Sequence, residues 1–272
     1  DATLIRLGLP AIGLPALGVL GSGLSSSIAS VFSVVVLAVA IRQIPAPPDP
    51  SRRAPSRELR RAILRLGLPF GLQTVAEVGV FAAVAVLAGR MGAHAAAGNT
   101  IAITLASFTF NVSLAIGAAT AMRVGLHVGR GDTNGARRAG LTGLLASTVV
   151  MTMAALAFFV APGAFARILT DDPGIIAAAV PLVLIAAVFQ ISDGVQAVAA
   201  GALRGAGDAR APLVANLCGH YLVGLPIAIT LGFGAGLGAP GLWWGLLAGL
   251  TAVAIGLTGR FLRLSGRPIG RA

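Results

Sequence analysis

The stretch LGLPFGLQTVAEVGVFAAVAVLAG, residues 66–89, decides what kind of fold this chain adopts. It is predominantly apolar and, as a helix rising about 1.5 Å per residue, long enough to cross the roughly 30 Å hydrocarbon core of a bilayer. Its one ionisable residue is Glu77. A carboxylate at the bilayer centre costs at least about 2.5 kcal/mol on insertion scales, so a retained one usually marks a cation site or an aqueous path. The stretch therefore predicts a membrane-spanning helix with a functional acid.

The composition of the whole chain also indicates a membrane protein. Of the 272 residues, 56% are hydrophobic and 11% are charged, against roughly 25% charged in an average soluble domain. The mean hydropathy is +0.90. The net charge of +11 comes from arginines, which lie at the ends of apolar stretches. We interpret them as topology signals and contacts with membrane lipids, and not as a nucleic-acid interface.

Seven apolar stretches are long enough to be complete spans, and they cover residues 21–41, 66–89, 95–122, 139–160, 175–203, 213–231 and 242–262. Residues 3–17, interrupted by Arg6, Pro10 and Pro15, are interpreted as the remnant of a further helix. The chain starts at Asp1 without a Met, so we expect a segment of a longer protein. The predicted fold is an all-α, polytopic transmembrane helix bundle of about seven spans plus a partial one.

The arginines alternate between the two sides of these spans. Seventeen fall on one side and three, Arg6, Arg90 and Arg167, fall on the other. Because basic residues concentrate in cytoplasmic loops, we expect a multi-pass protein of the bacterial plasma (inner) membrane with a cytoplasmic C-terminus. The loop 42–64 combines arginines with prolines and is predicted to be a cytoplasmic linker.

Polar residues form stripes within four of the spans, and one of these stripes, Asn216 and His220, is interpreted as helix packing. Gln73 and Glu77 are four apart, and Asp193, the second acid within a span, lies midway between Gln190 and Gln196 at intervals of three. The third stripe consists of Thr100, Thr104, Ser107 and Asn111. Because lipid solvates polar groups poorly, we expect the stripes to face inward and to wall a cavity that holds both carboxylates.

Structural roles compete with functional ones at these positions. For the stripe that begins at Thr100, hydrogen bonds to the helix's own backbone explain the pattern as well as substrate contact does. For Glu77 and Asp193 a functional role is favoured, because no Arg lies near the middle of any predicted span to neutralise an acid.

Signatures of catalysis and of cofactors are missing from the sequence. A chain without Lys cannot carry a phosphate-binding loop of the Gly-Lys-Ser type, and His94, His127 and His220 have no metal-ligand spacing. The serines at 25–27 have no His or acid nearby to activate them. We therefore predict that the protein is not an enzyme and has no cofactor.

A series of short motifs resembles a known family. In order they are RLGLP (65–69) followed by Glu77, IGAA (116–119), RVG (123–125), GRGDTNGA (129–136), QISDGVQ (190–196), GALRGAGD (201–208), GLP (224–226) and GLWWG (241–245). Their order and spacing over some 200 residues resemble the C-terminal half of the multidrug and toxic compound extrusion (MATE) family, NorM-type branch.

The resemblance implies a fold of twelve helices in two six-helix lobes. On this match residues 1–41 are the end of the N-terminal lobe (part of helix five and helix six), 42–64 the linker, 65–265 the C-terminal lobe and 266–272 a cytoplasmic tail. The remainder of the N-terminal lobe would belong to the full-length protein.

The resemblance also implies a function, which is export of cationic or amphipathic drugs in exchange for Na⁺ or H⁺. Glu77 and Asp193 would correspond to the acids that take the coupling ion, Na⁺ included. Phe189 stands where Na⁺-coupled relatives have a Tyr, so one oxygen ligand is missing and H⁺ coupling stays open. The predicted mechanism is alternating access of a cavity between two lobes.

Two other functions stay open at this point. A flippase for a lipid-linked precursor belongs to a similar superfamily, but its anionic substrate would favour arginines in the cavity. A membrane scaffold or nonfunctional fragment is the third alternative, because half a cavity has no second wall.

Overall fold

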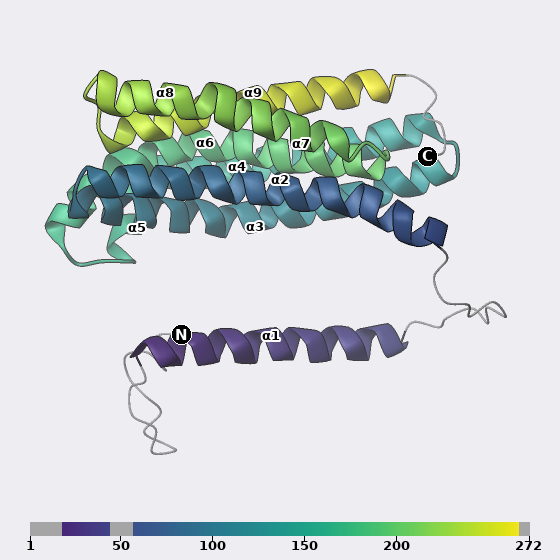
Figure 1. Ribbon diagram of the computed structural model, residues 1–272, viewed down its shortest axis with the longest axis horizontal. Coiled ribbons are helices and arrows are strands. Elements are labelled where there is room, and N and C mark those ends of the chain that lie inside the picture. The colour runs from purple at the N-terminus through teal and green to yellow at the C-terminus, as the bar shows by residue number, and fades with distance from the viewer. Residues whose placement is uncertain (1–17, 44–56, 267–272) are drawn as a thin grey trace, which may run out of the picture. The chain divides into compact units, whose positions relative to one another are not determined.

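The computed structural model describes residues 18–43 and 57–266, and every regular element in these ranges is a helix (Figure 1). The chain divides into two units, Asp1–Ser56 and Arg57–Ala272. The predicted partial helix at 3–17, most of the predicted linker and the predicted tail except Gly266 lie outside the described residues.

The first unit contributes one described helix, α1 (Gly18–Gln43). It coincides with the span predicted at 21–41. Its apolar stretch Ser27–Ala40 is shorter than the other candidate spans, and large side chains in it, among them Phe32 and Leu37, are exposed.

The second unit begins with α2 (Arg57–Arg90), so residues 57–64, which were assigned to the linker, are the first two turns of a helix. Pro55 precedes these turns, and the residues that follow it, mostly Arg and Leu, favour helix. Along the chain, the division between the two units falls between Ser56 and Arg57.

Six stretches of this unit are long and apolar enough to cross a membrane. They are α2 from Ile63, α3 (Ala93–Gly129), α4 (Thr133–Val160), α6 (Pro173–Gly205), the stretch Arg210–Gly234 and α9 (Ala239–Leu264). The prediction of an all-α transmembrane bundle is confirmed. A short helix that the sequence did not predict, α5 (Pro162–Arg167), connects α4 to α6.

The stretch Arg210–Gly234 is not one regular helix. It consists of α7 (Arg210–Asn216), the π-helix η3 (Leu217–Gly224), α8 (Leu225–Ile229) and the π-helix η4 (Thr230–Gly234). In a regular α-helix Pro226 would lack a donor and clash with the carbonyl four residues back, and the wider winding of η3 relieves that conflict. The apolar pattern of this stretch does not predict the change of winding.

Two similar tetrapeptides, GRGD (129–132) and GAGD (205–208), reverse the chain at one end of the bundle. Gly131 has φ 72° and Gly207 has φ 85°, a left-handed conformation that ends a helix and favours glycine. In both turns the backbone N–H of the Asp donates to a carbonyl of the preceding helix. Asp132 donates to the His127 carbonyl, and Asp208 donates to the Leu203 carbonyl. Each Asp side chain then accepts a backbone N–H at the start of the next helix. The repeated motif thus ends one helix and caps the N-terminus of the next.

The core depends on a close backbone contact between α3 and α6, the most extensive helix pair of the unit. A Cβ on Gly201 would overlap the carbonyl of Gly117, and a Cβ on Gly205 would overlap that of Ala121. A Cβ on Gly117 would lie 3.0 Å from the Ala197 carbonyl oxygen. Small residues at such positions let membrane helices approach closely and gain packing energy.

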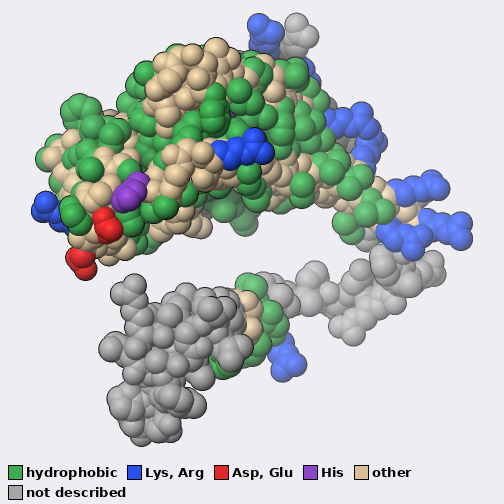
Figure 2. Space-filling view, turned by 60° about the vertical axis from the view of Figure 1, so that its left-hand side comes forward, with side chains coloured by type: hydrophobic (Ala, Val, Ile, Leu, Met, Phe, Trp, Pro, Cys, Tyr) green, Lys and Arg blue, Asp and Glu red, His purple; other side chains and the backbone are tan. Residues whose placement is uncertain are grey.

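The charges of the second unit separate along the bundle. The C-terminal ends of α3 and α6 meet, because a Cβ on Gly125 would lie 3.4 Å from the Gly205 carbonyl oxygen, and Phe261 of α9 packs on Gly140 of α4. The residues near these ends include Arg123, Arg130, Arg137, Arg138, Arg204, Arg260 and Arg263. Figure 2 shows most of the Arg colour toward one end of the unit. That this end faces the cytoplasm stays a prediction.

Substitution of Gly201 by Ala should lower the melting temperature Tm, because the added Cβ would overlap the Gly117 carbonyl. We expect a loss of about 1–3 kcal/mol in the free energy of unfolding, as for other overpacked sites. Gly256→Ala on α9 is the control, since nothing lies within 4 Å of its added Cβ, and it should leave Tm unchanged or raise it. Thermal unfolding of the purified protein in detergent measures both, and equal losses would contradict the close contact.

The carboxyl of Asp132 should make stability depend on acid pH. Bonds from the Gly135 N–H and then from the His127 ring hold its pKa below the usual 3.8. A lowered folded pKa means that the stabilisation is fully present above pH 3.8 and is lost as the pH falls through the folded pKa. Asp132→Ala should therefore lower Tm at pH 7. The difference in Tm between this variant and the unsubstituted chain should become smaller below pH 3.8. Asp132→Asn keeps a capping oxygen and should lose less at neutral pH. A difference in Tm between Asp132→Ala and the unsubstituted chain that does not change with pH would contradict this account.

Candidate functional site

Glu77 lies half-buried on α2, next to the point where a hydroxyl from another helix holds the backbone. The Tyr221 hydroxyl of η3 donates to the Ala76 carbonyl at 2.9 Å. Gly79 makes room for this contact, because a Cβ there would lie 2.7 Å from the Tyr221 hydroxyl oxygen. The position of Glu77 thus depends on Tyr221, which follows it by 144 residues in the chain.

Asp193 is buried on α6 beside an aromatic cluster. The Phe189 ring packs edge-to-face against Phe81 at a centroid distance of 6.0 Å and against Trp243 at 5.6 Å. The Trp243 indole N–H donates to Asn99 Oδ1 at 3.0 Å, which links α9 to α3. Phe189 therefore belongs to an apolar wall of the site. As a phenylalanine it offers no hydroxyl oxygen there.

Two pockets bring the carboxylates together. The Asp193 pocket, about 280 Å³, is lined by both Glu77 and Asp193. The Arg204 pocket, about 330 Å³, is lined by Glu77 and Arg204. The two pockets share the lining residues Glu77, Val78, Phe81, Ser107 and Phe110. α2, α3 and α6 thus build one composite site, as the polar stripes predicted for Glu77 and Asp193.

Arg204 corrects the expectation that the acids have no basic neighbour. It lies one residue before the end of α6, where its guanidinium stacks over the Phe70 ring at 4.6 Å. It also lies close enough to Glu77 for the two charges to interact. The expectation failed because a long side chain at the end of a helix reaches back along it. Among the described residues, however, neither carboxylate has an ion-pair partner within 4.0 Å.

Three buried glutamines differ in their contacts. Gln73 and Gln196 both line the Arg204 pocket, and no described residue donates to their Oε1 atoms. Gln190 instead accepts from the Thr109 hydroxyl at 2.8 Å and lines neither pocket. The Arg204 pocket therefore has a carboxylate in its wall and two glutamines whose buried amide oxygens have no described donor.

The polar stripe of α3 is only partly brought to the site. Ser107 lines both pockets. The other three are exposed and bond their own helix, with Thr100 donating to the Ala96 carbonyl, Thr104 to the Thr100 carbonyl and Asn111 to the Ser107 carbonyl. They line neither pocket, so the prediction that all four wall the cavity is met by Ser107 alone.

The most informative signal that sequence reasoning missed is the spacing of Arg204. It follows Asp193 by eleven residues, about three helical turns, and therefore lies on the same face of α6. Phe81 follows Glu77 by one turn. Trp243 had no such signal, because it arrives from α9.

Metal-ligating side chains do not cluster in the described part of the chain. No group of three or more His, Cys, Asp or Glu residues is found there. The described side chains at the site that carry oxygen are Glu77, Asp193, Ser107, Thr74 and the glutamines of the Arg204 pocket. This oxygen-only set suits a proton or a weakly held alkali cation better than a tightly bound transition metal.

A sequence model of a known family, MatE, matches residues 69–230, which contain both acids and Arg204. The chain belongs to the MatE family. It is 44% identical over 207 residues to a probable multidrug resistance protein NorM of Deinococcus radiodurans, with 74% of this chain and 46% of the relative covered. It is 40% identical over 216 residues to the multidrug resistance protein NorM of Burkholderia vietnamiensis, with 78% and 47% covered.

Solved structures agree with the MatE assignment at the level of fold. The crystal structure of the eukaryotic MATE transporter AtDTX14 aligns with a TM-score of 0.81 at 23% identity, covering 96% of this chain and 58% of that one. The MatE chain spans about half the length of the curated relatives it matches. The family consists of transporters and not of enzymes, as predicted.

Tyr221→Phe should loosen the site of this MatE chain without removing a ring. It deletes the hydroxyl that bonds the Ala76 carbonyl next to Glu77, and a lost hydrogen bond of this kind costs about 0.5–1.5 kcal/mol. Thr230→Val is the control, because its hydroxyl bonds only the Pro226 carbonyl of its own segment. Thermal unfolding should show a drop in Tm for Tyr221→Phe that exceeds the drop for the control, and equal drops would contradict a link between α2 and η3.

Proposed function

We propose that this chain forms the C-terminal part of a secondary active antiporter that exports cationic or amphipathic compounds in exchange for Na⁺ or H⁺. The observation that carries the proposal is the pairing of Glu77 and Asp193 in one membrane-embedded pocket without an ion-pair partner. Arg204 is the one basic residue that lines either pocket, and it forms no ion pair with Glu77. Both acids are therefore left to serve a moving charge.

The walls of the two pockets suit an amphipathic cation. Phe70, Phe81 and Phe110 supply ring surface, which attracts cations as well as apolar groups. Glu77 supplies a carboxylate, and Gln73 and Gln196 add polar side chains to the wall of the Arg204 pocket. A ligand with an aromatic body and a positive charge can use both kinds of contact at once.

Exchange follows from competition for the two acids. When the carboxylates are protonated or bound to Na⁺, their attraction for an organic cation is lost, and when they are free the attraction returns. Coupling to transport then requires that ion and drug favour different states of the whole transporter. The second wall of the cavity would come from the N-terminal lobe of the full-length protein.

We further propose that the Arg-rich end of the bundle faces the cytoplasm of a bacterial plasma membrane. The support is the separation of charge along the second unit, with Arg90 and Arg167 at the ends of α2 and α5 and the other described arginines of the unit toward the opposite end. Such asymmetry orients membrane proteins during insertion.

Binding of ethidium, a planar organic cation, to the purified 272-residue chain tests the two acids. Glu77→Gln and Asp193→Asn should each raise the dissociation constant about tenfold or more, which corresponds to about 1.4 kcal/mol. Asp171→Asn is the matched control, because Asp171 is an exposed loop carboxylate. Fluorescence titration gives the constants, and unchanged affinity in both site variants would sink the assignment.

The coupling ion is read from competition in the same assay. Adding Na⁺ at constant ionic strength, with choline as the reference cation, should weaken ethidium binding if Na⁺ couples. Lowering the pH without Na⁺ should weaken it if H⁺ couples. The double variant Glu77→Gln/Asp193→Asn should respond to neither. An unsubstituted chain that binds no cation and shows no thermal shift would instead indicate a scaffold or inactive fragment.

A flippase for a lipid-linked precursor is the second candidate, and Arg204 is the observation that favours it. An arginine in a pocket with the apolar walls Phe70, Phe110 and Leu114 can hold a diphosphate with a hydrocarbon tail. Farnesyl diphosphate would then bind the chain, and Arg204→Gln would abolish that binding. If the chain is a drug exporter, Arg204→Gln should leave ethidium binding unchanged or strengthen it.

A further inference from the structure

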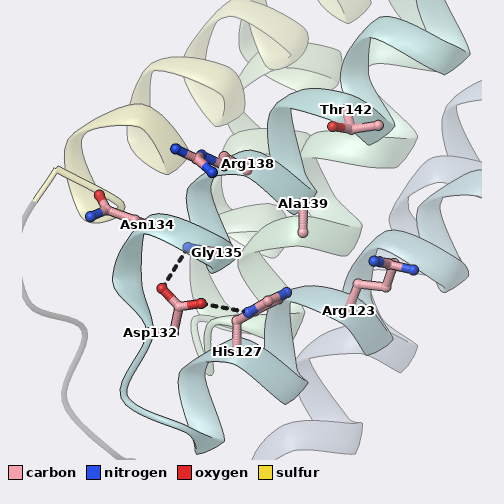
Figure 3. Close-up of a pocket in the computed structure, with 8 residues that line it drawn as sticks. All are labelled: Arg123, His127, Asp132, Asn134, Gly135, Arg138, Ala139 and Thr142. Atoms are coloured by element: carbon pink, nitrogen blue, oxygen red, sulfur yellow. Dashed lines mark hydrogen bonds and ion pairs between the residues drawn. The ribbon is translucent and has the colours of Figure 1, made fainter.

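A third pocket, of about 610 Å³, lies where α3 ends and α4 begins (Figure 3). Arg123 and His127 come from α3, and Arg138, Ala139 and Thr142 come from α4. Asp132, Asn134 and Gly135 complete the lining. It shares no lining residue with the pockets that hold Glu77 and Asp193, so the proposed antiport does not use it.

The pocket has unneutralised positive charge. Its one carboxylate, Asp132, accepts from the Gly135 N–H at 2.8 Å and pairs with His127 Nδ1 at 2.9 Å. Arg138 lies within electrostatic reach of that carboxylate, but neither Arg138 nor Arg123 forms an ion pair with a described residue. Figure 3 shows the two arginines on either side of Ala139, with the Asp132–His127 pair beside them. Two guanidinium groups are therefore available to an anion.

The local backbone holds this arrangement in place. The turn at Gly131 directs Asp132 back toward α3, where its carboxylate meets His127. A Cβ on Gly135 would overlap both the Asp132 carboxylate and the His127 ring. The carboxylate is thus held by the His127 ring and by the backbone at the start of α4.

The pocket lies at the C-terminal end of a helix that is longer than a membrane crossing requires. α3 has 37 residues and is therefore about 55 Å long, well beyond the roughly 30 Å of hydrocarbon that it crosses. On α4 the face that carries Arg138 and Thr142 continues, at intervals of three and four, through Leu145 and Val149, which are exposed. A polar pocket thus opens above an apolar strip, which matches a molecule with an anionic head and hydrocarbon chains.

We propose that this pocket binds the headgroup phosphate of an anionic phospholipid. Arg123 and Arg138 hold the phosphate oxygens, because the guanidinium fork matches phosphate geometry. Asn134 and Thr142 offer hydrogen bonds to the polar part of the headgroup. The acyl chains lie along Leu145 and Val149.

Lipid binding by the full chain tests the proposal. The chain is purified in detergent, titrated with phosphatidylglycerol or phosphatidylcholine, and analysed by native mass spectrometry. Phosphatidylglycerol should bind more tightly, and Arg123→Gln/Arg138→Gln should weaken it about tenfold or more. Arg130→Gln/Arg137→Gln is the matched control, since it removes the same charge from exposed residues of the same turn outside the pocket, and it should weaken binding less than about twofold. Equal losses, or no preference over phosphatidylcholine, would overturn the proposal.

A competition arm separates a membrane lipid from a soluble phosphate. Inorganic phosphate and glycerol 3-phosphate should fail to displace phosphatidylglycerol at equal concentration, because they lack the chains that contact Leu145 and Val149. Displacement at equal concentration would show that the pocket takes a soluble phosphate and would overturn the assignment to lipid.

A measurement on the unsubstituted chain keeps the test independent of variant folding. Phosphatidylglycerol with a photoreactive headgroup should crosslink to residues within 123–142. Crosslinks confined to other parts of the chain, such as the arginines near the end of α9, would reject the site.

Discussion

The close contact between the backbones of α3 and α6 is the constraint on which the rest of this fold depends. Gly201 packs on the carbonyl of Gly117, and Gly205 packs on that of Ala121, at positions that leave no room for a Cβ. Because lipid offers little hydrophobic drive for helix association, dispersion contacts at such short range stabilise the bundle. The same contact holds α6 so that Asp193 lies in a pocket with Ser107 of α3.

Charge is arranged around this frame at three depths. Asp193 is buried beside aromatic rings, Glu77 lies half-buried and lines both pockets, and Arg204 lines the Arg204 pocket from the end of α6. Beyond them, Arg123 and Arg138 stand at the turn between α3 and α4. The acids and the outer arginines therefore face different surroundings, which fits a cation site within the membrane and an anion site at its surface.

How much could be predicted differs from residue to residue. The helical interval of four predicted the common face of Gln73 and Glu77, and both line the Arg204 pocket. The same reasoning wrongly placed Thr100, Thr104 and Asn111 in the wall of the cavity. These side chains instead form hydrogen bonds to the backbone of their own helix. Arg204 was assigned to topology alone, although its spacing from Asp193 placed it on the same face. The π-helical winding of η3 and η4 was not anticipated, since apolar length does not distinguish one helical winding from another.

The sequence by itself determined the class of the protein, the order of its main spans, the separation of its charges and the two acids within the spans. These follow from local properties, because the cost of placing a polar group in hydrocarbon is felt residue by residue. Only the tertiary structure decided which side chains meet. Tyr221 reaches Ala76, Trp243 reaches Asn99, and Arg123 and Arg138 line one pocket from two different helices. The reason is physical: such contacts join helices distant in sequence, and their register is set by where glycines allow backbones to touch.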